Sequence, residues 1–446
     1  MALTFLEVNI ADNTPSRAEF HVLMVNGIEG ISMPYSYDLT LVRPGALPDV
    51  NPKRIVNTRA TLGIRREEGK DPPLLRMGII EHFEKAGFGT KNDDLRVYSA
   101  RMVPPFKMLD REVVFRVFEN MDVVAIIDTV LRGVPHLQID TGLLRQDGLE
   151  FPKMEYCVQF GESTFGFLSR LMNRFGIHYY FDTRGDPEDI QNELMVFGIA
   201  RTLDAACRQP LVDIVADNDL DDRADAVAGF VQRFDPVFRS SKFGNFNPLA
   251  PTKFFTATRK IDPGFDLSSD TAGPALNFKS EAFPVPVFSS QDAAAYAERF
   301  QKHEEANVAS IAGRSKNRTF TPGRNIFIKK DFIHARDNDT TTSLDGHTFL
   351  LSWVSFSAFE PNVGQSTPWK TIGEFFRALY HGESAAEVTN AFVIGTLKQY
   401  LESQQEVAWD RAFHHKREKA PHLISQLLTR GISQIAEGLG SLVAAI

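Results

Sequence analysis

Two short segments of the sequence come close to catalytic patterns. His303 and Glu304 begin like an HExxH zinc motif, but Asn307 stands where the second histidine would be. A zinc site of this kind needs two imidazoles one helical turn apart, so a single histidine cannot assemble it. We therefore expect a solvated, charged helix face here and no metal site.

The second segment, Gly382–Ala386 (GESAA), is similar to the GESAG nucleophile elbow of carboxylesterases and would make Ser384 a nucleophile. The elbow needs a strand before the serine and a helix after it, because that tight turn exposes the hydroxyl. Residues 369–380 have helical spacing instead, so Ser384 is expected to cap a helix. A hydrolase that uses Ser384 stays open as an alternative, but the sequence favours a protein that is not an enzyme.

Other reactive residue types are scarce. Cys157 and Cys207 are too few for a disulfide framework or a cysteine-based zinc site, and Cys157 is expected to be a small buried residue. His414 and His415 are adjacent, so their side chains diverge on a helix and cannot face one metal. The sequence contains no Walker-type phosphate loop. We predict no catalytic residue, no metal and no cofactor.

The composition is that of an ordinary folded protein, with 446 residues, 43% hydrophobic and 24% charged. The formal net charge of −8 argues against a nucleic-acid-binding protein, which would carry a basic excess. Phenylalanine is abundant at 36 residues, which suits sheet faces and wide interfaces. Residues 1–10 lack the pattern of a signal peptide, and no apolar run is long enough to span a bilayer. We expect a protein made in the cytoplasm and exported, if at all, without such a signal.

Short strands separated by turn residues dominate the first hundred residues. Tyr35–Leu41 alternates strictly between apolar and polar side chains, which is the period of a half-buried strand. The pattern predicts a small antiparallel β-barrel over residues 1–110. Strands return over residues 226–360, where we predict a second small antiparallel barrel that is interrupted by one helix at Ser290–Ser310.

An α/β connecting segment over residues 111–225 separates the two β regions. Apolar residues at helical spacing predict a first helix over 123–131, and a second helix begins at Ser163 as its N-cap and ends at Gly176. A strand over Ile177–Phe181 follows. The segment therefore places two short amphipathic helices against a sheet.

Two further stretches differ in composition from their surroundings. Residues 213–226 are acidic and poor in apolar residues, which predicts a linker or an exposed loop. The apolar residues of 361–446 are spaced helically, so we expect a helical C-terminal extension. The fold class is α+β, mainly β.

Residues 155–181 (EYCVQFGESTFGFLSRLMNRFGIHYYF) closely resemble the signature of VgrG proteins, the spike-hub components of type VI secretion. Members of that family carry a Y-C-V-Q-Y-x-E-S motif, then a helix, then G-I-x-Y-x-F. Three further blocks at 98–109, 115–120 and 320–325 follow the family's order, so the resemblance covers about residues 1–360. The residues that match the family motif are Tyr156, Cys157, Val158, Gln159, Phe160, Glu162, Ser163, Gly176, Ile177, Tyr179, Phe181, Pro322 and Gly323.

We expect these motif residues to be structural. Glu162 and Ser163 are predicted to cap or charge-match the start of the second helix. Four aromatic residues are predicted to be core residues that fix this helix to the sheet: Tyr156, Phe160, Phe165 and Phe175.

The resemblance implies two small β-barrels per chain, joined by an α/β segment, and a homotrimer whose six barrels match a hexameric tube ring. It also implies contacts with an Hcp-like tube protein and with baseplate proteins, and expulsion together with the tube. The expected function is therefore that of a structural hub in a contractile injection machine. A phage or prophage tail hub is one alternative, and a hub that bears a hydrolase-like enzyme is another.

Residues 361–446 depart from the family pattern. Family members continue from the hub into an oligonucleotide-binding-type barrel and a needle of triple-stranded β-helix, and nothing after residue 360 resembles either. The chain is therefore a shortened version of a longer protein, or another chain supplies the needle. A third possibility is that residues 361–446 recruit an effector or an adaptor.

Overall fold

The structure is a computed structural model, and its fold is mainly β. Within the described residues, no helix combines the length and the apolar character needed to cross a membrane. Those residues are 5–10, 20–44, 50–65, 74–86, 95–146, 151–182, 193–199, 205–216, 225–234, 239–247, 250–260, 279–283, 285, 287, 289–306, 309–315, 317, 319–333, 344–359 and 389–397.

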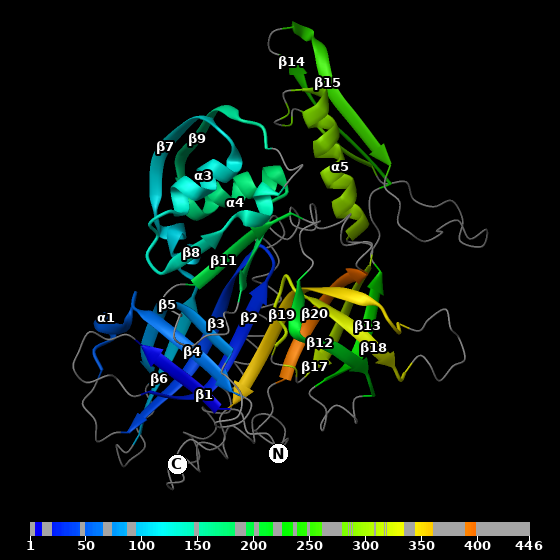
Figure 1. Cartoon of the computed structure of the whole chain (residues 1–446). Helices are drawn as coiled ribbons and strands as arrows, with labels where there is room; N and C mark the ends of the chain where they lie inside the picture. Colours follow the sequence, from blue (N-terminus) through cyan, green and yellow to red (C-terminus); the bar gives the residue numbers. More distant parts are fainter. Residues whose placement is uncertain are drawn as a thin grey trace, which may run out of the picture.

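Six antiparallel strands near the N-terminus form a closed ring, because the last strand in the pairing order also pairs with the first. We call these six strands the first strand ring (Figure 1, blue). β1 pairs with β2 as well as with β4, so the order returns to its start. Tyr35, Tyr37, Leu39 and Leu41 are buried in alternation, as the sequence predicts. In pairing order the strands are β1 (Phe5–Ile10), β4 (Arg59–Arg65), β5 (Leu74–Ala86), β6 (Leu95–Val103), β3 (Met33–Pro44) and β2 (His21–Gly30).

A second strand ring closes in the same way, because β19 pairs with both β18 and β20. β12 pairs in parallel with β13 and with β18, while the other pairs of this ring are antiparallel. The prediction of an antiparallel second barrel was therefore wrong at β12, a strand that comes from the connecting segment before residue 226. β19 also pairs with β2 of the first ring, from Trp353 opposite Gly30 to Phe359 opposite Met24. In pairing order the strands are β19 (Thr348–Phe359), β18 (Asn325–Asp331), β12 (Ala206–Ile214), β13 (Ala226–Phe234), β17 (Ala309–Ser315) and β20 (Thr389–Leu397).

β20 corrects the predicted helical extension. Residues 389–397 form a strand that pairs with β17 and β19, so the helical prediction was wrong there. The segment TNAFVIGTL is rich in β-branched and aromatic residues, and long-range pairing outweighs helical spacing in such a sequence. The rest of 361–446 lies outside the described residues.

The predicted loop over residues 213–226 is also corrected at both of its ends. Asp213 and Ile214 belong to β12 and are buried, and Ala226 begins β13. The parallel pair of Asp213 with Ala226 brings the two ends together. Residues 217–224, between them, lie outside the described residues.

A middle unit lies beside the rings in Figure 1 (cyan and teal). Its helices are α3 (Val123–Leu131) and α4 (Thr164–Phe175), which lie between the two-stranded ribbon β7–β9 and a sheet of order β10-β11-β8. Its strands are β7 (Val113–Met121), β8 (Leu137–Asp140), β9 (Met154–Ser163), β10 (His178–Asp182) and β11 (Glu193–Gly198). The short helices of the chain are α1 (Pro52–Ile55), α2 (Pro105–Met108), η1 (Leu109–Arg111) and η2 (Gly142–Arg145).

Both main helices of this unit begin at a side-chain cap. Asp122 caps α3 by accepting the amide of Ala125 at 2.8 Å, and Ser163 caps α4 by accepting the amide of Gly166 at 3.0 Å. Gly176 ends α4 in the left-handed region with φ of +67°. The predicted start and end of the second helix are therefore confirmed.

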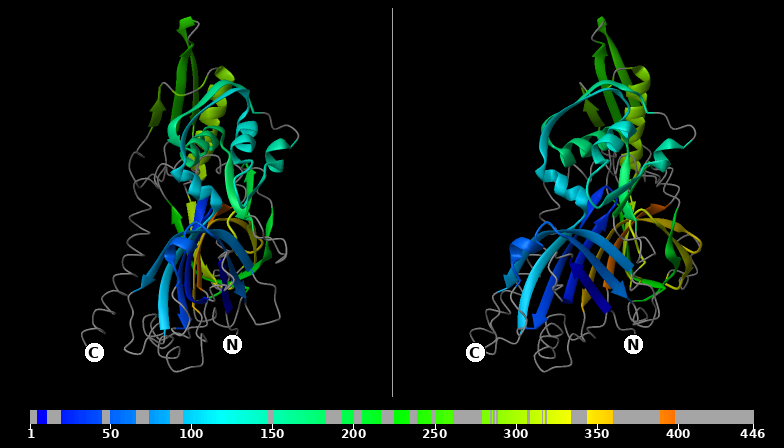
Figure 2. Two further views of the ribbon diagram at one scale, coloured as in Figure 1. Left: turned by 90° about the vertical axis from the view of Figure 1, so that its left-hand side faces the viewer. Right: turned by 60° about the vertical axis from the view of Figure 1, so that its left-hand side comes forward.

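The arm is a third body, which projects away from the strand rings (Figures 1 and 2). It consists of β14 (Ser240–Asn247), β15 (Ala250–Lys260), β16 (Lys279–Ala282) and helix α5 (Ser290–Ala306). Phe243 fixes the helix to the sheet, since its ring lies 5.2 Å from that of Tyr296 and 4.8 Å from that of Phe300. The predicted helix over 290–310 is α5, but it ends at Ala306 because Ala309 already begins β17.

Two contacts fasten the middle unit to the rings. Phe181 of β10 packs edge-on against Tyr35 of the first ring, with ring centroids 5.0 Å apart. On the side of the second ring, the turn at Gly323 lies against the ring of Tyr180. Arg324, next along this turn, forms an ion pair with Asp182 of β10.

We predict that Gly323→Ala lowers the free energy of unfolding by about 2–4 kcal/mol. Gly323 has φ of +82°, and an added Cβ would lie 2.6 Å from Cγ of Tyr180. The matched control is Gly346→Ala, where φ is +77° but nothing lies within 4 Å of the added Cβ. The control is expected to cost only about 1 kcal/mol of backbone strain. Urea unfolding measures both, and equal losses would contradict the role of the Tyr180 contact.

Candidate functional site

The β7–β9 ribbon carries the family-like motif, and its two faces differ. The inner face packs on the helices, where Phe118 stacks on Phe167 of α4 at 5.6 Å and Cys157 and Gln159 are buried. The outer face, which we call the ribbon face, exposes between 41% and 78% of each large apolar side chain. Its members are Val113, Phe115, Val117, Tyr156, Val158 and Phe160.

Cross-strand pairs order the ribbon face. Phe115 lies opposite Phe160 with ring centroids 5.2 Å apart in an edge-on arrangement, and Val117 lies opposite Val158. Gly161 has φ of +63° at the register shift of the ladder, which is the conformation of a glycine β-bulge. The six side chains therefore form one contiguous apolar strip on a surface.

Polar contacts at the inner face hold the ribbon to the start of α4. The Gln159 amide donates to Oγ1 of Thr164 at 3.2 Å and to the carbonyl of Glu162 at 3.0 Å, and Arg116 donates to Oε1 of Gln159 at 3.3 Å. The Ser163 hydroxyl donates to Asp110 at 3.0 Å while it caps α4. Every hydrogen bond of this set lies on the helix side, so the ribbon face stays purely apolar.

The structure corrects part of the predicted core. Tyr156 and Phe160 are 65% and 78% exposed, so the prediction that they are core residues was wrong. The reason is the strand period, because Cys157 and Gln159 occupy the inward positions between them. Phe165 and Phe175 are partly buried against the core, in agreement with the prediction.

The two cysteines are buried and carry no reactive thiolate. Burial raises the pKa of Cys157 and raises that of Cys207 to about 11. A thiol whose pKa is raised stays protonated near pH 7 and is a poor nucleophile. The prediction that Cys157 is a small buried residue is confirmed.

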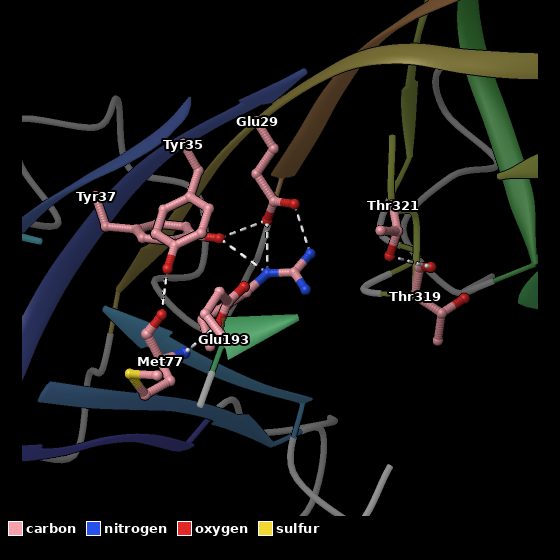
Figure 3. A network of polar contacts seen from close by, with 8 residues as sticks. Glu29, Tyr35, Tyr37, Met77, Glu193, Thr319 and Thr321 are labelled. Atoms are coloured by element: carbon pink, nitrogen blue, oxygen red, sulfur yellow. Dashed lines mark hydrogen bonds and ion pairs between the residues drawn. The ribbon is translucent and has the colours of Figure 1, made fainter. Parts of the chain in front are cut away.

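The other motif residues lie where the middle unit meets the rings. Gly176, Ile177, Tyr179 and Phe181 are buried at the end of α4 and along β10. Two motif blocks that are far apart in the sequence meet here, since the buried Pro322–Gly323 turn lies against Tyr180. Within this turn, the Thr321 hydroxyl donates to the carbonyl of Thr319 at 3.3 Å (Figure 3).

A buried ion pair inside the first ring was not predicted from the sequence (Figure 3). Arg76 of β5 pairs with Glu29 of β2, and both side chains are buried. Nε of Arg76 lies 3.1 Å from Oε1 of Glu29 and 3.0 Å from the Tyr37 hydroxyl, which itself donates to Glu29 at 2.6 Å. Burial opposes the charge of Arg76, but the interactions with Glu29, Tyr37 and Glu193 together outweigh burial and raise the pKa of the guanidinium. The sequence feature that could have indicated this ion pair is Arg76 itself, an arginine inside the apolar run Leu74–Ile80.

The same network reaches into the middle unit. Glu193 of β11 accepts the amide of Met77 at 3.1 Å, and the Tyr35 hydroxyl donates to the carbonyl of Met77. Burial raises the pKa of Glu193 to about 8, so this carboxyl group is protonated at neutral pH. Glu193 therefore links the middle unit to the first ring without adding a buried charge.

The described residues contain no cluster of metal-ligating side chains. No three His, Cys, Asp or Glu side chains among them lie close enough to hold a metal ion. His303 lies within α5, while Asn307, Ser384, His414 and His415 lie outside the described residues. What the described site offers is an apolar contact surface on a unit that is held firmly to the strand rings.

The comparisons with known proteins agree on one kind of protein. The model of the phage tail baseplate hub (GPD) family matches residues 28–349. The type VI secretion system spike protein VgrG5 of Pseudomonas aeruginosa is 26% identical over 339 residues, which are 75% of this chain and 36% of that protein. The chain thus spans about a third of the length of this curated relative.

Two solved structures share the fold at low identity. The E. coli c3393 protein, a type VI secretion component with structural similarity to the T4 tail proteins gp27 and gp5, matches with a TM-score of 0.51 and 16% identity. That match covers 87% of this chain and 76% of c3393. A tail protein of Neisseria meningitidis matches with a TM-score of 0.57 and 12% identity, over 90% of this chain and 98% of that one.

We predict that Arg76→Met lowers the free energy of unfolding by about 3–5 kcal/mol, because it leaves Glu29 buried without a counter-charge. The control is the double variant Arg76→Met/Glu29→Gln, which removes both charges and is expected to recover most of the loss. Urea unfolding measures both variants. A double variant as unstable as the single one would show that the uncompensated charge is not the cause.

We predict that Glu193→Gln flattens the pH dependence of stability between about pH 4.5 and pH 8. In this window the folded chain keeps the proton on Glu193 and the unfolded chain loses it. The wild type therefore loses up to about 1.4 kcal/mol per unit of rising pH, and the Gln variant is spared this loss. Unfolding across this pH range tests it, with Glu119→Gln on the exposed side of β7 as the control. Parallel profiles for wild type and Glu193→Gln would contradict the prediction.

Proposed function

The chain belongs to the phage tail baseplate hub family, and from this membership we propose that it is the structural hub of a contractile injection machine of the type VI secretion kind. The curated relatives, which are type VI spike proteins, favour this machine. Under this proposal three copies assemble around one axis, contact a hexameric Hcp-like tube protein and the baseplate, and are expelled with the tube. The chain is made in the cytoplasm and needs no signal peptide for that route.

The observation that carries the proposal is the closure of two strand rings in one chain. We take these rings as the two small barrels, so that three copies of the chain present six similar bodies around an axis. Such an arrangement matches a six-fold tube ring on one side and keeps three-fold symmetry on the other. The first barrel is assigned to residues 1–110 and the second to 226–360, completed by β12 from the connecting segment 111–225 and by β20.

The role that we propose is mechanical and not enzymatic. Closed rings leave no strand edge along their circumference, and the ion pair of Arg76 and Glu29 ties β5 to β2, two strands of the first ring that are not paired with each other. A hub that is pushed along its axis needs such rigidity and needs no reacting group. We propose that the segment 361–446, outside β20, binds an effector or an adaptor.

A phage or prophage tail hub is the second candidate. It is favoured by the match to the Neisseria tail protein, of which the chain covers 98%. The two candidates differ in the tube protein that is bound. Mixing the purified chain with an Hcp-like hexamer and, separately, with a phage tail tube protein distinguishes them.

We predict a particle of three times the 50.0 kDa chain mass in light scattering at micromolar concentration. The same sample is expected to bind the Hcp-like tube ring with one trimer per hexamer. A stable monomer, or a dimer, would contradict the proposed three-fold hub. A trimer that binds only the phage tube would support the second candidate.

We predict that deleting residues 398–446 removes the effector or adaptor and keeps the trimer. The deletion begins after β20, because removing all of 361–446 would also open the second ring. A pull-down from the native cell compares the full chain with the deletion variant. Identical partners for both would contradict a recruiting role of this segment.

A further inference from the structure

The ribbon face is unusual for the surface of a folded chain. Six large apolar side chains lie on one side of two neighbouring strands, and none of them is less than 41% exposed. Contiguous apolar strips of this kind mark contact sites for another surface. Glu119 is an exposed charged residue with the strand parity of Val117, and it lies opposite Tyr156, so the ribbon face has an acidic margin.

The arm carries a second exposed apolar face. Phe246 of β14 lies opposite Phe254 of β15, and the Phe283 ring lies 5.9 Å from that of Phe254. These rings are 44%, 58% and 54% exposed. Phe246 and Phe254 alternate with Phe243 and Phe255, which pack with α5, so the pair points away from the helix. We call Phe246, Phe254 and Phe283 the arm face.

The margins of the two faces have opposite charge. The three strands of the arm expose four lysines and one glutamate, Glu281. Lys242 and Lys260 have the same strand parity as the Phe246–Phe254 pair and so lie on the same side of the sheet. Of the exposed glutamates of β7 and β9, Glu119 lies on the side of the ribbon face, whereas Glu155 has the parity of the inward residues Cys157 and Gln159. An apolar centre with oppositely charged margins is the pattern of two complementary contact surfaces.

The two faces cannot meet within one chain in this arrangement, because the ribbon and the arm lie on opposite sides of helices α3 and α4 (Figures 1 and 2). A ring of three identical copies needs two different, complementary contact faces on each copy. Each copy presents one patch to the neighbour on one side and a different patch to the neighbour on the other side.

We propose that the ribbon face of one copy packs against the arm face of the next copy around the three-fold axis. This inference rests on the proposed function for the number of copies, and it adds the residues that join them. The central contact sets Phe115 and Phe160 against Phe254, with Glu119 near the lysines of the arm. The exposed Tyr156 and Phe160 of the family-like motif then become interface residues.

A pair of cysteines tests the contact directly in the full-length chain. The double variant Phe160→Cys/Phe254→Cys is expected to form a covalent trimer under mild oxidation, which a non-reducing gel resolves. The matched control combines Phe160→Cys with Leu211→Cys, since Leu211 is 57% exposed on the second ring and away from the arm. Cross-linked trimer in the first variant alone supports the proposal. A native trimer that forms no cross-link in the first variant overturns it.

A charge-pair experiment gives a second, independent measurement. Phe160→Glu and Phe254→Glu are each expected to raise the trimer dissociation constant at least about tenfold, because a carboxylate would be buried in an apolar contact. Phe160→Glu/Phe254→Lys is expected to restore the trimer at low salt, whereas Phe160→Glu/Phe254→Glu is not. Circular dichroism checks that these exposed positions leave the fold unchanged.

The outcomes separate this inference from the proposed function. A wild-type chain that stays monomeric contradicts the three-copy hub and, with it, the proposed contact between ribbon face and arm face. A wild-type trimer that is unaffected by both single Glu variants leaves the hub intact and overturns only the contact between ribbon and arm.

Discussion

Closure of the strands into rings is the constraint on which the rest of the architecture depends. A sheet edge exposes unpaired backbone groups, and a hub built from open sheets would add strands from other copies without limit. The first ring closes through β1 and β2, and the second closes through β19 and β20. The antiparallel pair of β2 with β19 then makes one continuous sheet of the two rings. The middle unit and the arm are attached to this double ring, and neither contributes a strand to it.

The attachment of the middle unit combines a buried charge pair with a carboxyl group that stays neutral. Arg76 keeps its charge because Glu29 pairs with its Nε and Nη2 atoms and the Tyr37 hydroxyl accepts from Nε inside the ring. Glu193 reaches the same region from β11. A third full charge there would be destabilising, because its desolvation penalty would exceed the gain from electrostatic attraction. Its raised pKa resolves this conflict, because the protonated carboxyl group accepts the Met77 amide without adding a charge. Toward the first ring, the orientation of the middle unit is therefore specified in part by the hydrogen bond of Glu193, which lies beside the buried Arg76–Glu29 pair.

The sequence predicts those parts of the fold that depend on residues close together in the chain, such as the buried side of a strand and the ends of a helix. The alternation of apolar and polar residues in Tyr35–Leu41 predicts which side of this strand is buried. Ser163 and Gly176 predict where α4 begins and ends, because helix caps depend on only a few neighbouring residues. The strand β20 could not be predicted, since its partners β17 and β19 lie far away in the sequence. The sequence predicts Phe160 as a core residue, since aromatic side chains are usually buried. The inward positions of its strand belong instead to Cys157 and Gln159, and only the position of α4 reveals this.

Closure also decides how copies of the chain associate. Rings without free edges cannot join by adding strands, so contact between the rings of two copies must use faces of side chains. The outward surface of the rings alternates with polar residues along β3, where Ser36, Asp38 and Thr40 point away from the core. The ribbon β7–β9 departs from this rule, because Phe115, Val117 and Phe160 occupy outward positions that solvent would fill with polar residues. Apolar residues persist at such positions when another surface covers them, and the arm, with its aromatic face and lysine margin, is the complementary surface that each neighbouring copy carries.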